Sequence, residues 1–426
     1  MRFIVDVHCH IMTLARPNVG TFIDALAHRP LEYLKTQITA PKYLLTSLFN
    51  RGGSSIRNTI AVADNDASAI IGLMHDDLQG TIGPADECPI LQNGRFHALG
   101  ETFDGMIVCP LLMDFSRPSQ IRPDIYYNAP TQKHGEFMVL EILHGIRRYL
   151  KEHPQSRSSA LQGRLSAPAV AGRLIVRPFL GIDPTCMTDD EVYRILHQYF
   201  SGYKRSLNKQ VRASLALERW DGSLHKIHPS IFAGIKLYPP LGFDPWPDNP
   251  AQRAACCALY QFCERKRIPI TTHCDDGGYR TIPLPEAEHY TNPERWEHVL
   301  KHYPELYLNF AHFGHRYQEN SKTNRAWTES IVKFISQYPH VYSDVSFNGC
   351  DFEYWNWLEK YIAGKPMATG DVLRTRLMFG TDFLINLLKI DSYRSYIKGF
   401  FDSTLDYELK HAMITMNPLQ FLFDYK

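Results

Sequence analysis

Apolar and polar positions follow a regular rhythm through the second half of the chain. Short apolar runs rich in β-forming residues recur about every 32 to 39 residues, and stretches with apolar residues at helical spacing follow them. Because parallel strands need long crossover connections, this repeat predicts parallel strands joined by right-handed helical crossovers. The runs cover residues 231–237, 268–273, 306–312, 341–346 and 376–382.

Three further strands are predicted in the first half, over residues 3–8, 106–113 and 174–182. Together with the later runs they give eight strands, the number that closes an α/β barrel. We therefore expect an α/β protein with a single domain over residues 1–426, folded as a distorted (β/α)8 TIM barrel. An open doubly wound sheet is the alternative that fits the same pattern.

The connection between the first two predicted strands, at roughly 95 residues, is too long for an ordinary βα loop. Residues 13–100 therefore indicate a mainly helical insertion on the barrel, with helices predicted near 22–48 and 55–78 and a Gly- and Pro-rich loop at 80–100. The insertion is either a lid over the catalytic face or an outer buttress. A basic, serine-rich stretch at 156–173 is typical of an exposed connector.

Composition and charge narrow the class of protein. The chain has 426 residues, of which 44% are hydrophobic and 21% are charged, as in globular proteins. Its 46 Lys and Arg nearly balance 45 Asp and Glu. The chain therefore lacks the positive electrostatic potential that is typical of proteins that bind nucleic acids or bind membranes through polybasic segments. We find no apolar run of the ~18 residues that cross a bilayer and no signal peptide. Nine cysteines without a CxxC pair indicate reduced thiols, so we expect a cytoplasmic protein, as a monomer or a homodimer.

Two histidines, His8 and His10, close the first predicted strand. Side chains two residues apart share a face of a strand, so both imidazoles point the same way, with Asp6 behind them. Phe3, Val5, Val7 and Cys9 then occupy the opposite face, towards the surrounding helices. Two imidazoles at the C-terminal end of a barrel strand are well placed to chelate one metal ion.

Four more chemically active side chains lie at or next to the C-terminal ends of predicted strands four, five, six and eight. Each histidine alone is explained equally well as a hydrogen-bonded core residue, and the aspartate as a helix N-cap. Charged and metal-binding groups are costly inside a barrel unless they are paired or ligated. Together they therefore predict a shared metal site on one catalytic face. These residues are Lys236, His273, His312 and Asp382.

This set resembles the motif of the amidohydrolase superfamily of metal-dependent barrels. The Gly-Ile-Lys-Leu-Tyr-Pro run around Lys236 and the Phe-Gly-Thr-Asp run that ends at Asp382 are most similar to the amidohydrolase-related branch that includes aminocarboxymuconate-semialdehyde decarboxylase. The resemblance implies one divalent metal ion, zinc, with a coordination position left for water. The implied ligands are His8, His10, His273 and Asp382. Three imidazoles and a carboxylate suit Zn²⁺, and an open site lowers the pKa of bound water toward about 7.

The resemblance also implies catalytic roles. Asp382 would act as general base for the bound water, and His312 would polarise a substrate carbonyl, hold the developing oxyanion or ligate a second metal. Lys236 would bind a substrate carboxylate beside a single metal or, if carboxylated, would bridge two metals. A buried salt bridge is a third interpretation of this lysine. The single-metal site is the expected one.

The function favoured by this motif is hydrolysis of an amide, lactone or related bond of a small molecule by zinc-activated water. Metal-dependent decarboxylation of a small carboxylated substrate on the same site is the second candidate, because the resembling branch contains both chemistries. A catalytically inactive binding barrel is the alternative from a different class, and the complete motif disfavours it. No nucleic-acid or membrane partner is expected.

Overall fold

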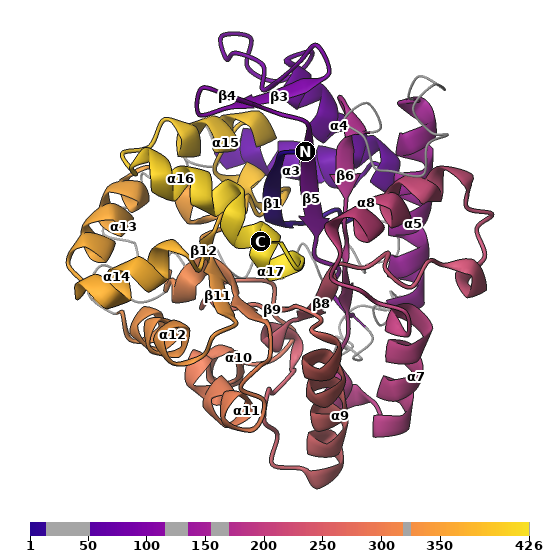
Figure 1. The fold of residues 1–426 in the computed structure, drawn as a ribbon, viewed down its shortest axis with the longest axis vertical. Coiled ribbons are helices and arrows are strands. Elements are labelled where there is room, and N and C mark those ends of the chain that lie inside the picture. Colours follow the sequence, from indigo (N-terminus) through magenta and orange to yellow (C-terminus); the bar gives the residue numbers. More distant parts are fainter. Residues whose placement is uncertain (14–51, 116–134, 155–169, 318–324, 426) are drawn as a thin grey trace.

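Short parallel strands at the centre of the molecule are surrounded by helices (Figure 1). The computed structural model describes residues 1–13, 52–115, 135–154, 170–317 and 325–425. Two parallel sheets carry these strands. The first has the order β1 (Phe3–Cys9), β5 (Gly105–Pro110), β6 (Leu174–Val176), and the second β7 (Phe179–Gly181), β8 (Gly234–Leu237), β9 (Ile270–Thr272), β10 (Leu308–Phe310), β11 (Val341–Asp344), β12 (Leu377–Met378).

The two sheets are linked at both of their edges. At one edge, β6 and β7 are parts of one segment that is interrupted at Pro178, which lacks a backbone N–H. Here the Leu112 N–H donates to the Phe179 carbonyl at 3.2 Å. At the other edge, the Val7 N–H of β1 donates to the carbonyl of Phe379 after β12, also at 3.2 Å. The arrangement is TIM-barrel-like, as the sequence predicts.

Each predicted strand region contains a strand, and most of the observed strands are shorter than predicted. His8 and Lys236 lie within β1 and β8, whereas the other candidate residues follow the ends of their strands. His312 and Asp382 follow β10 and β12 with φ angles of 61° and 57°, in the left-handed region that is costly for residues other than glycine. This backbone turns the chain out of the ladder, so these side chains stand at the strand exits.

The outer layer consists of helices that join successive strands. In α9, Asn249 caps the start by accepting hydrogen bonds from two backbone N–H groups, and Arg267 ends the helix in the left-handed conformation. The helices are α5 (Gly135–Glu152), α7 (Asp189–Phe200), α8 (Leu207–Ala216), α9 (Pro250–Lys266), α10 (Leu284–Thr291), α11 (Glu297–His302), α12 (Ala326–Gln337), α13 (Glu353–Ala363), α14 (Met367–Arg374), α15 (Tyr393–Phe401), α16 (Tyr407–Ile414) and α17 (Met416–Leu422).

The connection between β1 and β5 differs from the predicted insertion in one respect. Helices α3 (Gly52–Ala63) and α4 (Ala67–Gln79) match the second predicted helical stretch, but the predicted loop at 80–100 contains β2 (Leu91–Gln92) and β3 (Arg95–Ala98). With β4 (Glu101–Phe103) these strands form an antiparallel sheet.

The signal for this sheet is Asn93-Gly94. Both residues have positive φ angles, as a two-residue hairpin turn requires. The buried face of α4 packs against α5 and α15 in the outer layer. The predicted helix at 22–48 lies outside the described residues.

The predicted connector at 156–173 is only partly described, because residues 155–169 lie outside the described ranges. Its described end is buried and not exposed. Arg173 is 4% exposed and donates from Nε to the backbone carbonyl of His153 at 2.6 Å. None of the nine cysteines, all of which are described, forms a disulfide, as expected.

Gly380 lies where the chain leaves β12 and passes β1. A Cβ atom here would lie 2.7 Å from the Cβ of His8 and 3.0 Å from the Cβ of Ser346, and neither atom is the far end of a flexible chain. We expect Gly380→Ala to lower the free energy of unfolding by ~1–3 kcal/mol, measured by urea denaturation. Gly72→Ala on α4 is the matched control, because a Cβ there meets nothing within 4 Å. Equal stability of the two variants would contradict this packing.

Candidate metal centre and active site

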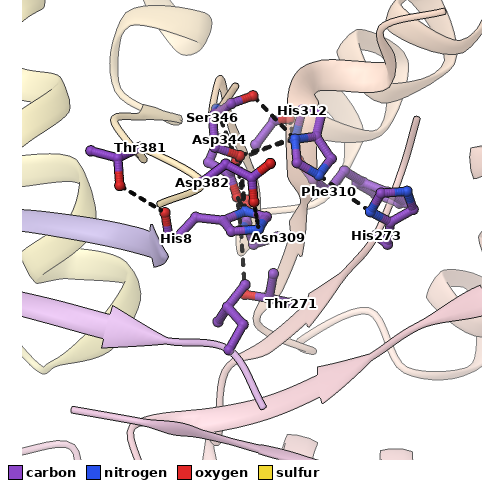
Figure 2. A network of polar contacts seen from close by, with 12 residues as sticks. His8, Thr271, His273, Asn309, Phe310, His312, Asp344, Ser346, Thr381 and Asp382 are labelled. Carbon is purple, nitrogen blue, oxygen red and sulfur yellow. Dashed lines mark hydrogen bonds and ion pairs between the residues drawn. The ribbon is translucent and has the colours of Figure 1, made fainter. Parts of the chain in front are cut away.

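His8 lies near the C-terminal end of β1 and is completely buried (Figure 2). Its Nδ1 lies 3.2 Å from both oxygens of the Asp344 carboxylate and 2.9 Å from Ser346 Oγ. An ionised carboxylate only accepts hydrogen bonds, so the proton of a neutral His8 ring is on Nδ1 and the lone pair is on Nε2. Nε2 has no hydrogen-bond partner among the described residues and faces Asp382 Oδ1 at 3.4 Å. The ring therefore offers Nε2 as a metal ligand.

His10 is held in the same tautomer by a different partner. Its Nδ1–H donates to the backbone carbonyl of Leu111 at 3.0 Å, and its Nε2 lies 3.2 Å from the same Asp382 oxygen. A nitrogen from each of the two histidines and an oxygen of Asp382 all lie within 4.8 Å of one another. Three of the four predicted metal ligands are thus close enough to share one ion.

The fourth predicted ligand, His273, lies in a neighbouring group with Asp275 and His312. Its Nδ1 is 3.2 Å from His312 Nε2, and its Nε2 is 3.1 Å from Asp275 Oδ1. The rings of His8 and His312, with centroids 4.8 Å apart, connect the two groups. These histidines and carboxylates therefore form one continuous constellation of three overlapping potential ligand groups, of which Figure 2 labels His8, His273, His312, Asp344 and Asp382. The groups are His8, His10 and Asp382; His8, His312 and Asp344; and His273, Asp275 and His312.

Lys236 is buried at 1% exposure on β8. Its Nζ has no hydrogen-bond partner among the described residues, and no ion pair within 4.0 Å is found for it there. The salt bridge to Asp6 or Asp382, one of the interpretations of this lysine, is therefore not formed. Burial lowers the pKa of Lys236 to about 8, against the attraction of the nearby carboxylates. At pH 7 the group is still mainly an ammonium.

The site carries an excess of buried negative charge. Burial raises the pKa values of Asp275, Asp344 and Asp382, but the neighbouring imidazoles outweigh burial and hold all three pKa values below their usual range. Burial lowers the pKa of His8, and Asp344 and Asp382 together outweigh it and raise the pKa to about 9. The field that favours a proton on His8 also attracts a divalent cation. The imidazole and carboxylate donors suit zinc and other first-row divalent ions.

Asp344 is a site residue that the sequence analysis did not assign. Its carboxylate accepts hydrogen bonds from Asn309 Nδ2 at 2.6 Å and from the His312 backbone N–H at 3.2 Å, besides its contact with His8. It is the last residue of β11, which corresponds to the seventh of the eight predicted strands. The strand-end rule that selected the other candidates therefore applies to it as well.

Asp6 lies against the backbone of His8, whose N–H donates to Asp6 Oδ1 at 3.1 Å. Its carboxylate also accepts hydrogen bonds from Thr381 Oγ1 at 2.7 Å and from the Tyr393 hydroxyl at 3.0 Å. The β1–β5 register shifts between Asp6 and Cys9, which interrupts the simple alternation of faces.

The same register shift explains the apolar residues of β1. Phe3, Val5 and Val7 pack in one cluster with residues of α17, whereas Ile4 and Cys9 pack in the larger cluster with the outer helices. The single shared face predicted for Phe3, Val5, Val7 and Cys9 is therefore not observed.

Comparison with known families identifies this part of the fold. A family model described as amidohydrolase matches residues 224–423. The matched residues, a little under half of the chain, are similar to the amidohydrolase family. The amidohydrolase match extends from before β8 to the end of α17, and it contains four of the predicted site residues, Lys236, His273, His312 and Asp382. The resemblance carried by the motif is confirmed.

Solved structures similar to this chain share little sequence with it. A 5-carboxyvanillate decarboxylase from Sphingomonas paucimobilis is 9% identical, with a TM-score of 0.44 and 99% of each chain covered. A manganese-bound 5-carboxyvanillate decarboxylase from Novosphingobium aromaticivorans is 10% identical, with a TM-score of 0.46 and 99% and 96% of the two chains covered. A zinc-bound amidohydrolase from Burkholderia multivorans is 11% identical, with a TM-score of 0.44 and 99% and 98% covered. No curated protein matches the chain.

The described helices include none that is long and apolar enough to cross a bilayer.

Proposed function

We propose that the protein is a metal-dependent decarboxylase of a small carboxylated molecule. The observation that carries this proposal is the buried ammonium of Lys236, which has no hydrogen-bond partner among the described residues. Its Nζ lies 5.5 Å from the centre of the Tyr238 ring. A buried ammonium without a hydrogen bond is costly, and an anionic substrate group in the site would remove that cost. A carboxylate is the anion that the substrate of a decarboxylase would present. This ordering reverses that of the sequence analysis, which placed hydrolysis first.

The metal site belongs to the same proposal. His8, His10 and Asp382 would hold one divalent ion, zinc by donor type, with His273 approaching from the neighbouring group. When bound, the ion would supply a Lewis acid that stabilises negative charge developing on the substrate. We also infer that the two sheets form a closed (β/α)8 barrel in one domain, with residues 13–100 as its insertion. In that barrel these side chains would meet at the C-terminal face.

Decarboxylation breaks the C–C bond to the carboxyl group, and the carbon left behind must receive a proton. The pair of His312 and His273 beside Asp275 is the proton source in this proposal. The carboxylate of Asp275 stays ionised, because the imidazoles lower its pKa, and it contacts both rings. Burial lowers the pKa of His273 to about 4, so this ring would pass a proton on rather than hold it. Lys236 binds the substrate's anionic group, and the buried walls keep water away from the carbanion.

Hydrolysis is the second candidate, and Asp382 is the observation that favours it. Its carboxylate lies between the Nε2 atoms of His8 and His10, where a general base for metal-activated water is needed. The same two contacts lower the pKa of Asp382 well below its usual value, which makes it a weak base. Decarboxylation needs no base at this position, and for that reason we place it first.

Isotope labelling separates the two reactions. Zinc- or manganese-loaded protein is incubated with small aromatic carboxylates and with matched lactones and amides, in D2O and in H2 18O, and products are analysed by mass spectrometry. We expect release of CO2 and one deuterium at the carbon that carried the carboxyl group, without 18O in the organic product. Hydrolysis would instead place 18O in the product without release of CO2.

Lys236→Met tests the role of the ammonium in the same assay. We expect KM for the carboxylated substrate to rise about tenfold or more while metal content stays unchanged, because a charge-assisted contact is lost. Lys226→Met is the control, because that lysine is exposed and pairs with Asp221. If fully metallated protein turned over no substrate of either class, the inactive binding barrel would replace both enzymatic proposals.

A further inference from the structure

A separate group of potential metal ligands lies between α4 and the end of α5, away from the candidate active site. It consists of His75, Asp76 and His153, and one ligand atom from each lies within 4.8 Å of the others. The two imidazole rings have centroids 4.4 Å apart. His75 is almost fully buried at 3% exposure, and the other two residues are half-buried.

The ring of His153 is oriented by its surroundings. Its Nδ1–H donates to the carbonyl of Tyr149, one turn earlier in α5, at 3.0 Å. Arg173 in turn donates to the carbonyl of His153 at 2.6 Å and holds the chain end in place. With the proton on Nδ1, the lone pair of His153 is on Nε2.

The ring of His75 has one partner and one unsatisfied nitrogen. Its Nδ1 lies 3.4 Å from the hydroxyl of Tyr149, which also accepts the N–H of Leu174 at 3.0 Å. Its Nε2 is buried and has no hydrogen-bond partner among the described residues. Such an atom costs stability unless something binds it. Burial and the neighbouring His153 lower the pKa of His75 to about 4, so the ring is neutral and needs no deprotonation before ligation.

We propose that His75, Asp76 and His153 bind a second divalent cation of the zinc type, which joins α4 to the end of α5. Two imidazole nitrogens and one carboxylate oxygen suit this ion, with water in the fourth position. The site lies at the opposite end of the strands from the candidate active site, because Tyr149 beside it binds Leu174, the first residue of β6. The ion is therefore structural and takes no part in the proposed reaction.

The experiment measures zinc per chain by plasma mass spectrometry on the full-length protein after zinc loading and gel filtration. We expect two zinc ions per chain in the wild type and one in His153→Gln. His302→Gln is the matched control, because His302 also binds the carbonyl four residues before it, at 2.7 Å, and it is not among the potential ligand groups. It should keep both ions.

The Asp382→Asn background isolates the second site from the first. There we expect one zinc, visible d–d bands when cobalt replaces it, and a zinc-dependent rise in Tm that disappears on adding His153→Gln or Asp76→Asn. Circular dichroism shows whether His153→Gln or Asp76→Asn fails to fold. If one of them does, the zinc content and Tm of the other variant test the proposal. Equal zinc content in His153→Gln and His302→Gln, or no zinc-dependent change in Tm in the Asp382→Asn protein, would overturn the proposal. This readout does not depend on the enzymatic activity.

Discussion

The Asp382→Asn protein is expected to lose about 1,000-fold or more in kcat/KM and to retain no tightly bound metal at the candidate active site. Asp382 Oδ1 lies 3.2 Å from His10 Nε2 and 3.4 Å from His8 Nε2, so it is the only carboxylate of that ligand group. Asparagine removes its charge and presents an NH2 group on one side, which repels a cation. Metal content by mass spectrometry and turnover of the carboxylated substrate check the result.

Asp371→Asn is the control for this change, because Asp371 is exposed on α14. Dialysis of the wild type against a chelator should reproduce the loss of activity, and adding zinc or manganese should restore it. An Asp382→Asn protein that kept both its metal and its activity would disprove the role of this ligand group.

Asp344→Asn is expected to weaken metal binding and to lower kcat/KM by about 10- to 100-fold, the usual effect of losing a residue that orients a ligand. Asp344 is a positioning residue here. Its carboxylate accepts a hydrogen bond from His8 Nδ1–H and further hydrogen bonds from Asn309 and His312. An amide at this position can turn its NH2 group towards His8 and shift the proton to Nε2, which removes the lone pair that would bind the metal.

Titration of the metal-free protein with zinc distinguishes positioning from a general loss of structure. Thr271→Val is the control within the same network, because Thr271 Oγ1 accepts a hydrogen bond from Asn309 at 3.3 Å and bonds to no histidine in the described part of the chain. We expect its zinc affinity to change less than about threefold. If Asp344→Asn and Thr271→Val had equal affinities, the proposed role of Asp344 would fail.

The sequence predicts the parallel strands well, because β-forming runs and the helices between them repeat at a nearly constant interval. The helix predicted over 252–266 is observed as α9, with its cap at Asn249. The antiparallel sheet at 91–103 is absent from the prediction although Asn93-Gly94 signals a hairpin. The high Gly and Pro content of this segment predicts a loop, whereas the Asn-Gly pair within it predicts a hairpin turn.

Part of the site depends on information that lies outside any local window. The partner of His8 is Asp344, which is 336 residues away in the chain, and no spacing rule connects them. The position of Asp6 depends on a register shift in β1, which only the pairing with β5 reveals. The way in which the histidines share their neighbouring carboxylates likewise follows from side-chain geometry. The ends of the strands can be located from the sequence, whereas the residues of other strands that contact each histidine cannot.

The link between β1 and the residues after β12 has a consequence for the synthesis of the protein. His8 and His10 leave the ribosome early, but Asp382 and the backbone that pairs with β1 are translated more than 350 residues later. A nascent or prematurely terminated chain therefore has an open first strand and an incomplete ligand set. In the proposed enzyme, metal loading would therefore be a late step of biogenesis, after translation has passed β12 and Asp382.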